Sequence, residues 1–251
     1  MKLTHNTILV TGGTSGIGRA LAEALHDRGN RVLVTGRRRA SLDEMSARRP
    51  GLIGLAVDVD DPGSAPRLAA WLRENAPSLN VVLANAGISR AEDMASGTWT
   101  AGDATAVVQT NILGVLRVAE AVLPLLKANG RATFMATSSA LAFVPRADFP
   151  AYCASKAFLH SWLQSLRHQM RAFDIEVLEL SPPYVQTELT GPGQASDPRA
   201  LPLADYVGQV LTRLEAGDTP NGEVLLERDL PRRWAERDGT YAAVYAAMNP
   251  V

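Results

Sequence analysis

Residues 8–18 read ILVTGGTSGIG, an apolar strand-like run that passes through a glycine-rich turn into an amphipathic helix. Gly12, Gly16 and Gly18 let backbone amides and the N-terminus of that helix approach a pyrophosphate, because glycine has no side chain to keep the two apart. The stretch therefore predicts the first strand and helix of a doubly wound parallel sheet with a dinucleotide site. A glycine-rich turn is a weak signal by itself.

The rest of the chain alternates between strand-like and helix-like segments, with no long linker, low-complexity stretch or internal repeat. This alternation predicts one α/β domain over residues 1–251, a Rossmann-like parallel sheet with helices on both faces. We expect strands at about residues 7–11, 31–35, 53–57, 80–84, 132–137, 175–180 and 223–227.

A segment at about residues 188–204, rich in Gly and Pro, follows the sixth expected strand. Ligands of open α/β sheets bind beyond the carboxyl ends of the strands. The segment therefore fits a substrate lid, and it fits an ordinary surface loop equally well.

Bulk composition narrows the class of protein. The 251 residues carry a formal net charge of −1, which gives no overall attraction for nucleic acid or an anionic membrane. Residues 1–7 lead directly into the first strand without a signal-peptide pattern, and we expect no apolar run of the roughly 20 residues that span a bilayer. Cys153 is the one cysteine, so no intrachain disulfide can form. We expect a cytoplasmic protein with neither a nucleic-acid nor a membrane partner.

A second motif runs from Tyr152 to Lys156. Residues four apart share a helix face, so the phenol and the ammonium lie one turn from each other. The lysine charge favours the phenolate, and we expect it to lower the pKa of Tyr152 toward neutral pH. Together with the glycine turn, the pair predicts hydride transfer to or from a nicotinamide cofactor, with Tyr152 as the general acid/base.

These motifs, in this order, resemble the short-chain dehydrogenase/reductase family over nearly the whole chain. The matching positions are 11–18, 58, 85–87, 111, 138–139, 152 with 156, and 181–187. Residues 141–145, 152–154 and 165–169 resemble the DltE-like subgroup in finer detail. The resemblance implies a small-molecule carbonyl or alcohol substrate and catalytic roles for Asn111, Ser139, Tyr152 and Lys156.

Two of these roles have a local alternative. Ser139 lies 13 residues before Tyr152, the family spacing, but Ser138 competes with it, and two adjacent serines can also simply terminate a strand. Asn111 falls in an apolar helical run, where a buried amide is costly unless paired. The resemblance implies that Asn111 supports a water that relays protons to Lys156; a purely structural asparagine is the alternative.

The end of the second expected strand indicates the cofactor. Enzymes that use NAD place an acidic side chain there, and Gly36 stands at this position. Arg37 follows and can meet a phosphate through its planar fork. Residues 37–39 also fit a solvated helix start, although arginines there oppose the helix dipole. We expect NADP(H), with NAD(H) as the alternative.

The family resemblance implies a set of cofactor-binding positions. Lys156 would hold the nicotinamide ribose, and Asp58 would meet the adenine. The full set is Gly12, Thr14, Ser15, Gly16, Ile17, Gly18, Arg37, Arg38, Asp58, Val59, Asn85, Ala86, Gly87, Tyr152, Lys156, Pro182, Val185 and Thr187.

The substrate pocket is expected to be apolar. Phe143, Val144, Phe149 and Tyr184 border the motifs and would suit a hydrophobic carbonyl compound or alcohol, although the same residues fit core packing equally well.

His160 lies two turns beyond Tyr152 on the same helix face. We expect it to pack rather than to act as a base, because the sequence offers no evident partner carboxylate. Cys153 is expected to be a small buried hydrophobe. No spacing of His, Cys or carboxylate side chains predicts a metal site.

The helix that carries Tyr152 is unusually apolar, which predicts a homodimer or homotetramer with this helix in an interface. A monomer in which all of these side chains face the sheet is the alternative. The side chains are those of Phe158, Leu159, Trp162, Leu163, Leu166 and Met170.

Together these features predict an NADP(H)-dependent oxidoreductase that transfers a hydride between the nicotinamide and a carbonyl or secondary alcohol substrate. An NAD-dependent dehydrogenase of the same family is one alternative. A cofactor-sensing regulatory module is another, and such a module could keep the glycines while losing Tyr152 or Lys156.

Overall fold

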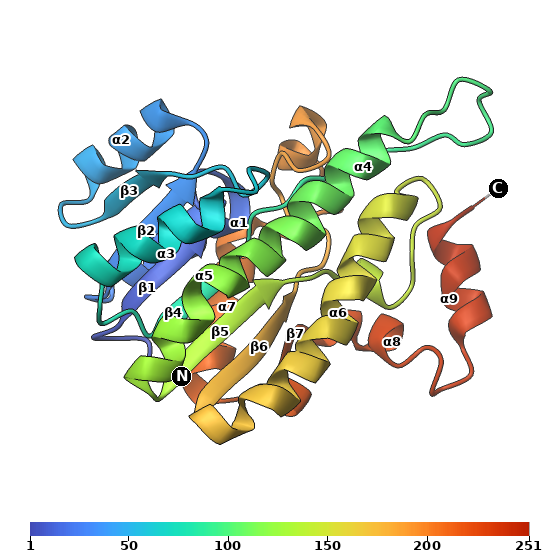
Figure 1. The fold of residues 1–251 in the computed structure, drawn as a ribbon. Helices are drawn as coiled ribbons and strands as arrows, with labels where there is room; N and C mark the ends of the chain where they lie inside the picture. The colour runs from blue at the N-terminus through green and yellow to red at the C-terminus, as the bar shows by residue number, and fades with distance from the viewer. Residues whose placement is uncertain (251) are drawn as a thin grey trace.

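A computed structural model describes residues 1–250. Seven parallel strands form one sheet in the order β3-β2-β1-β4-β5-β6-β7 (Figure 1). This order confirms the predicted fold class, and each expected strand is present within two residues of its expected ends. The strands are β1 (Thr7–Thr11), β2 (Arg31–Gly36), β3 (Ile53–Ala56), β4 (Val81–Ala84), β5 (Ala132–Thr137), β6 (Ile175–Ser181) and β7 (Glu223–Leu225).

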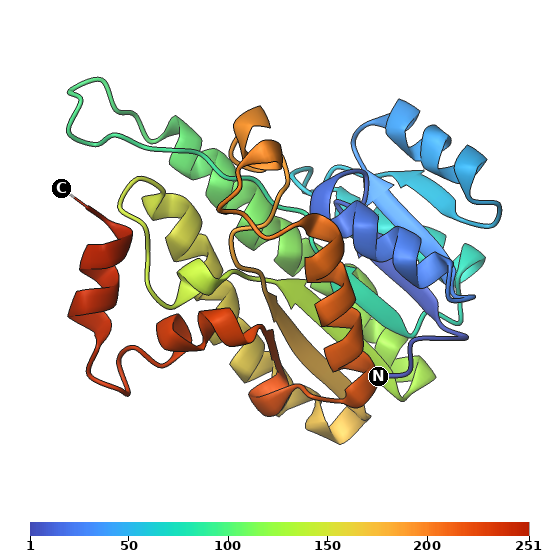
Figure 2. The ribbon, with the colours of Figure 1, turned by 180° about the vertical axis from the view of Figure 1, so that it is seen from behind.

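Helices cover both faces of the sheet (Figures 1 and 2). One face carries α1 (Gly16–His26), α2 (Arg39–Arg48) and α7 (Leu203–Ala216). The other carries α3 (Ser64–Asn75), α5 (Gly114–Asn129) and α6 (Pro150–Met170). A short helix, α4 (Gly102–Val108), runs through a π-helical turn, η1 (Gln109–Leu113), into α5. The last helices are α8 (Leu230–Arg233) and α9 (Tyr241–Met248), at the edge of the molecule.

The apolar pattern of the strands explains this layering. β1 is buried at every position, as expected of a parallel strand covered on both sides. Successive side chains point to opposite faces, so Leu9 packs under α3, α5 and α6, whereas Ile8 and Val10 pack under α1, α2 and α7.

The helical stretch Gly102–Asn129 corrects one sequence expectation. By length and composition it is apolar enough to cross a bilayer, contrary to the expectation that no such run exists. Half of its apolar window is buried in the fold, because one side of α5 packs against the sheet and α3. A core helix meets the same criteria as a membrane span.

The apolar side of α6 also differs from its expectation. Leu159, Leu163, Leu166 and Met170 are buried against the sheet, so these four need no partner surface. Trp162 packs edge-on against Phe134, with ring centroids 6.2 Å apart. Phe158 alone among the six counts as exposed, at 37%. Most of the apolar surface of α6 is therefore ordinary core.

Candidate active site

A cleft of about 540 Å³ opens beyond the carboxyl ends of the strands. It lies where the chain leaves β1 and β4 toward opposite sides of the sheet, the usual ligand position in this fold. Its lining brings together every predicted cofactor position except Gly18. It also contains Gly36, Ser138 and residues that no sequence motif indicated: Thr35, Val57, Asp60, Ile88, Arg90, Thr110 and Thr137. Pro183 and, from the expected lid segment, Glu188, Leu189, Gln194 and Leu203 line it as well.

The glycine turn forms one wall of the cleft. Gly12 has a φ of +61°, and a Cβ at this position would lie 2.6 Å from the Cα of Ala86. Gly18 lies beneath the wall, where a Cβ would collide with the Asn85 amide. α1 begins at Gly16 without a side-chain cap from Ser15, so its first-turn amides are left for another acceptor. A pyrophosphate would fit this cradle.

The opposite end of the cleft is basic. Arg38 donates from Nη2 to Thr14 Oγ1 over 3.2 Å, which joins the end of β2 to the glycine turn. The Arg37 side chain is 63% exposed, and its guanidinium lies 3.8 Å from the Asp60 carboxylate. Thr110 Oγ1 also donates to the Asp60 carboxylate, over 3.0 Å. Both arginines line the cleft, and each uses only one guanidinium nitrogen in these contacts, which leaves other N–H donors for a ligand.

α6 places Tyr152 and Lys156 on the wall of the cleft. Their exposed fractions are 8% and 4%. The Lys156 ammonium donates to the carbonyl oxygen of Thr137 over 2.8 Å and lies 5.5 Å from the centroid of the Tyr152 ring. Ser139 enters the same wall from the loop after β5. The structure thus gathers three of the four predicted catalytic residues in one lining.

Burial controls the pKa values of Tyr152 and Lys156. It raises the pKa of Tyr152 to about 12, and a hydrogen bond from Ser139 offsets part of this rise. It lowers the pKa of Lys156 to about 8, because a buried ammonium loses its hydration. The expectation that the pKa of Tyr152 is lowered toward neutral pH is therefore wrong for the chain by itself, where loss of solvent raises it.

The two adjacent serines point in different directions. The Ser138 hydroxyl donates to Glu179 Oε1 over 2.5 Å and lies 3.0 Å from the Ser181 hydroxyl, inside the fold. The Ser139 hydroxyl accepts from the amide of Leu141 over 3.1 Å and is close enough to Tyr152 to affect its pKa. The two residues continue β5 in extended backbone, where neighbouring side chains face opposite sides, which explains the division.

Asn111 lies in the π-helical turn η1 and is completely buried. Its Oδ1 accepts from the amide of Ile88 over 2.8 Å. Its Nδ2 donates to the carbonyl oxygen of Ile88 and to Ser155 Oγ, each over 3.0 Å. The Ser155 hydroxyl donates in turn to the carbonyl oxygen of Tyr152 over 2.7 Å, a link between η1 and α6 that sequence reasoning missed.

The four residues expected to form the substrate pocket lie elsewhere. Val144 is fully buried, and Phe143 packs edge-on against His160 with centroids 5.0 Å apart. Phe149 packs behind Tyr152, while the Tyr184 hydroxyl donates to Asp197. The loop after Ser139 turns into the fold, which draws its apolar residues away from the lining of the cleft.

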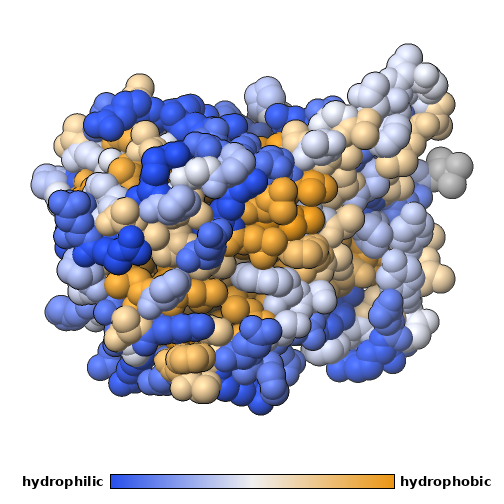
Figure 3. Space-filling model, in the orientation of Figure 1, coloured by the Kyte–Doolittle hydropathy of each residue, from blue (hydrophilic) through white to orange (hydrophobic). Residues whose placement is uncertain are grey.

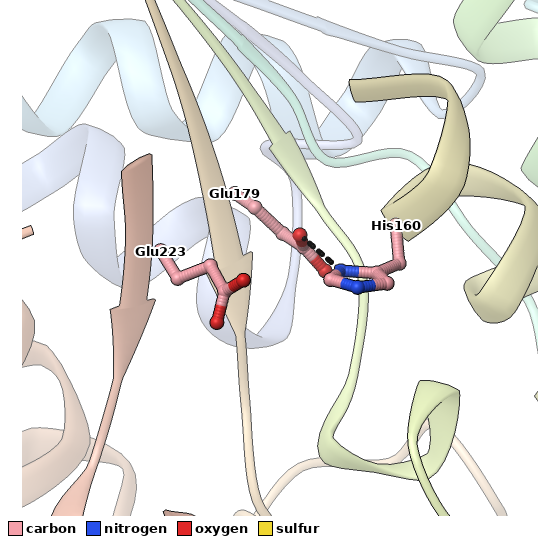
Figure 4. A group of neighbouring side chains, drawn as sticks. All are labelled: His160, Glu179 and Glu223. Carbon is pink, nitrogen blue, oxygen red and sulfur yellow. Dashed lines mark hydrogen bonds and ion pairs between the residues drawn. The ribbon is translucent and has the colours of Figure 1, made fainter. Parts of the chain in front are cut away.

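His160 has the carboxylate partner that the sequence did not reveal (Figure 4). Its Nδ1 lies 2.8 Å from Glu179 Oε2, and Glu223 completes a group whose ligand-type atoms lie within 4.8 Å of one another. The expectations of no partner carboxylate and no such cluster are wrong, because β6 and β7 bring in both glutamates from far along the chain. Arg233 binds both oxygens of Glu223, at 2.8 and 2.9 Å, so this carboxylate is already neutralised.

The segment after β6 crosses the mouth of the cleft. Glu188, Leu189 and Gln194 line it, and Gln194 is buried with its Nε2 donating to the carbonyl oxygen of Val185 over 2.7 Å. A bridge between Val185 and Leu201 joins the two ends of the segment. The segment is therefore a closed loop, secured at its base.

A model of the short chain dehydrogenase family matches residues 6–197. The chain belongs to this family. It is an NAD(P)-dependent oxidoreductase, as the fold and the family together show. This short chain dehydrogenase is 35% identical over 255 residues to the uncharacterized oxidoreductase DltE of Bacillus subtilis, with 99% of this chain and 98% of that protein covered.

Solved structures share the fold of this short chain dehydrogenase. One is a short chain dehydrogenase from Burkholderia cenocepacia in complex with NADP, with a TM-score of 0.83, 24% identity and 99% of each chain covered. Another, from Burkholderia phymatum in complex with NAD, has a TM-score of 0.79 and 18% identity, with 100% of this chain and 98% of that chain covered. At these identities the likeness concerns the fold.

Proposed function

We propose that this short chain dehydrogenase uses NADP(H) to interconvert a carbonyl compound and a secondary alcohol. The observation that carries the proposal is the shared lining of Ser139, Tyr152 and Lys156 with the glycine turn and the two arginines. One cleft thus holds a proton donor and a cradle for a phosphorylated dinucleotide.

The residues of the cleft fit a nicotinamide dinucleotide. The glycine turn leaves space where any Cβ would collide with Ala86, and the first-turn amides of α1 face a pyrophosphate. When bound, the nicotinamide supplies or accepts the hydride. Arg37 and Arg38 support the choice of NADP(H), because two guanidinium groups at the adenosine end match a 2′-phosphate.

Tyr152 is suited to donate a proton. With a pKa of about 12 it is protonated at neutral pH and acts as the general acid in carbonyl reduction. Lys156, with a pKa of about 8, is mostly an ammonium at neutral pH and stabilises the phenolate that the transfer leaves. The Ser139 hydroxyl orients the substrate oxygen toward Tyr152.

Asn111 and Gly87 support a proton relay. A Cβ at Gly87 would lie 3.3 Å from Asn111 Oδ1 and 3.5 Å from Lys156 Nζ, so the glycine keeps open a space between the two polar groups. A water in this space would accept from the Lys156 ammonium and donate to Asn111 Oδ1. Asn111 would hold this water in place, and a proton that the water takes up from solvent would restore the ammonium of Lys156 after it has passed a proton to Tyr152.

The substrate is a small carbonyl or alcohol with an apolar body. Ile88 packs in the same cluster as Tyr152, and Pro183 and Leu189 line the cleft. Leu189 belongs to residues 188–204, which we propose as the lid that excludes water from the reaction. A cytoplasmic location and a homo-oligomeric state remain predictions.

The experiment follows absorbance of NADPH across a panel of ketones and aldehydes, with NADH in parallel. We expect turnover with NADPH on at least one apolar ketone or aldehyde. A folded protein that binds NADPH and reduces no member of the panel would contradict the proposal and favour the cofactor-sensing alternative.

A further inference from the structure

Glu179 is the most enclosed charged side chain near the site. It lies in β6 with no exposed surface. Its Oε1 accepts from the hydroxyls of Ser138 and Ser181, over 2.5 and 3.3 Å, and its Oε2 lies 2.8 Å from His160 Nδ1 (Figure 4). Burying a carboxylate without hydrogen-bond partners is costly, so these three contacts both compensate the buried charge and hold the side chain in one position.

Each partner of Glu179 is next to a residue of the active site. Ser138 precedes Ser139 at the end of β5, and Ser181 precedes Pro182, which lines the cleft. His160 lies one helical turn after Lys156 on α6. One carboxylate therefore joins three segments that contribute Ser139, Lys156 and Pro182 to the lining of the cleft.

We propose that Glu179 is a positioning residue for the reaction proposed above, which holds Ser139 in place through Ser138 and supplies a fixed negative charge behind Lys156. The inference rests on that proposed function. It adds a residue that does not line the cleft and acts only through its neighbours.

The positioning role follows from the strand geometry. Ser139, just beyond β5, keeps an extended backbone with φ −168° and ψ 156°. With the Ser138 hydroxyl drawn toward Glu179, the Ser139 side chain therefore faces the other way, toward Tyr152. The amide of Ser138 also donates to the carbonyl oxygen of Leu180 over 2.7 Å, so the end of β5 is held by both backbone and side chain. Loss of the side-chain bond frees the serine pair to rotate.

The electrostatic role follows from the position of Glu179, whose Oε2 lies 2.8 Å from Nδ1 of His160, one helical turn after Lys156 on α6. Loss of hydration lowers the pKa of Lys156, and the charge of Glu179 opposes this fall. Glu179 therefore helps Lys156 to remain an ammonium at neutral pH. The charge of Glu179 likewise opposes the fall that burial causes in the pKa of Arg167, which also lies on α6.

The other charged side chains near Glu179, those of Glu223 and Arg167, have hydrogen-bond partners of their own. Glu223 from β7 is bound by both arms of Arg233, the last residue of α8. Arg167 donates to the carbonyl oxygens of Val177 and Gly222, over 2.9 and 3.3 Å. A metal ion at His160, Glu179 and Glu223 would have to displace the Arg233 fork, so the group is better described as an ion-pair network.

Two substitutions separate the two roles. Glu179→Gln keeps an oxygen that accepts from Ser138 and removes the charge. Ser138→Ala keeps the charge and removes the side-chain bond. Each variant is assayed in the direction of carbonyl reduction with NADPH, for kcat, for cofactor affinity and for the pH profile between pH 6 and 10.

We expect Glu179→Gln to move the alkaline limb of the kcat profile to lower pH by at least about half a unit, because Lys156 loses its proton more readily. We expect Ser138→Ala to lower kcat roughly fivefold at unchanged NADPH affinity, the effect of losing one orienting hydrogen bond. An unshifted limb would overturn the electrostatic role, and an unchanged kcat the positioning role.

Glu176→Gln is the matched control. Glu176 lies in the same strand and also accepts from β5, through Thr133 Oγ1 over 3.1 Å, but at the end of the sheet remote from the cleft. It should leave kcat and the pH profile unchanged. Tyr152→Phe is measured alongside to separate failure of the proposed function from failure of this inference. If Tyr152→Phe remains active, the proposed function fails. If Tyr152→Phe loses its turnover while Glu179→Gln and Ser138→Ala both behave like the wild type, only this inference fails. If Glu179→Gln does not fold, Ser138→Ala still decides the positioning role.

Discussion

Gly36 faces Thr14 across the adenosine end of the cleft at a distance that leaves no room for a side chain. A Cβ at residue 36 would lie 2.7 Å from Thr14 Cγ2. Thr14 is itself held by Arg38 through a 3.2 Å hydrogen bond. The position at which NAD enzymes carry an acid is therefore closed to one here unless Thr14 moves.

Gly36→Asp should weaken NADPH binding more than NADH binding, because the new carboxylate repels a 2′-phosphate and also displaces Thr14. We expect at least about a tenfold loss for NADPH, equivalent to roughly 1.4 kcal/mol. Gly36→Ala, which adds bulk without charge, should affect both cofactors alike. Fluorescence titration measures the affinities, and unchanged NADPH binding by Gly36→Asp would place the 2′-phosphate elsewhere.

Arg37→Ala tests the basic end directly. Only NADPH carries the 2′-phosphate, so the variant should lose roughly 1.5 to 3 kcal/mol of NADPH binding, about one to two decades in affinity, and little of NADH binding. Arg39→Ala is the control, because Arg39 pairs with Asp43 over 3.0 Å outside the cleft. Equal loss of both cofactors would make Arg37 a structural residue.

Tyr152→Phe should keep the fold and NADPH affinity while reducing kcat by on the order of 10²-fold or more, because only the proton donor is removed. Steady-state kinetics together with circular dichroism measure the two properties. Tyr245→Phe, at an exposed tyrosine of α9, should behave like the wild type. A folded Tyr152→Phe with near-normal turnover would exclude the mechanism.

Lys156 should reduce the stability of the fold at neutral pH. Burial lowers its pKa from 10.5 to about 8, so the folded chain binds this proton more weakly than the unfolded chain does. The free energy of unfolding therefore rises as pH increases from about 8 toward 10.5, where only the unfolded state still carries the proton.

Lys156→Met should consequently raise the free energy of unfolding at pH 7 while abolishing turnover. The shift corresponds to about 3 kcal/mol, and loss of the hydrogen bond to Thr137 offsets about 1 kcal/mol, which leaves a gain of about 2 kcal/mol. The gain should shrink at pH 9.5 in urea unfolding. Lys2→Met, at an exposed lysine, should leave the free energy of unfolding unchanged at both pH values. If Lys156→Met is less stable than the wild type at pH 7, the buried charge of Lys156 is better compensated than its burial implies.

The sheet was predictable because its signal is local. Parallel strands buried on both faces read as short apolar runs, and residues 7–11 and 132–137 were located to the residue. Spacing along one strand or helix likewise indicated the glycine turn and the Tyr152 to Lys156 pair, which share the cleft.

The errors concern contacts between distant segments. Glu179 reaches His160 from β6, and no pattern around residue 160 indicates that partner. The direction taken by the loop after Ser139 decides whether Val144 faces the cleft or the core, and its apolar sequence fits both. The pKa of Tyr152 depends on burial, which spacing to Lys156 does not reveal.

The protein should form a dimer or tetramer through α4, η1 and α6. Figure 3 shows apolar residues gathered over the continuous helical stretch of α4, η1 and α5, beside α6. Val108, Leu113 and Phe158 are 41%, 38% and 37% exposed, and α4 packs directly against α6, so the three belong to neighbouring helices. Two-fold symmetry would bring two copies of this patch together and remove it from water.

Phe158→Glu should break that association, because pairing two copies would bury two carboxylates in an apolar interface. Light scattering at micromolar concentration should give two or four times the monomer mass of 26.8 kDa for the wild type and a smaller species for the variant. Phe173→Glu is the control, since Phe173 is 43% exposed but lies in the 3-10 turn after the far end of α6, next to Lys127. A wild-type protein that scatters as a monomer would show that the patch is not an interface between copies of this chain.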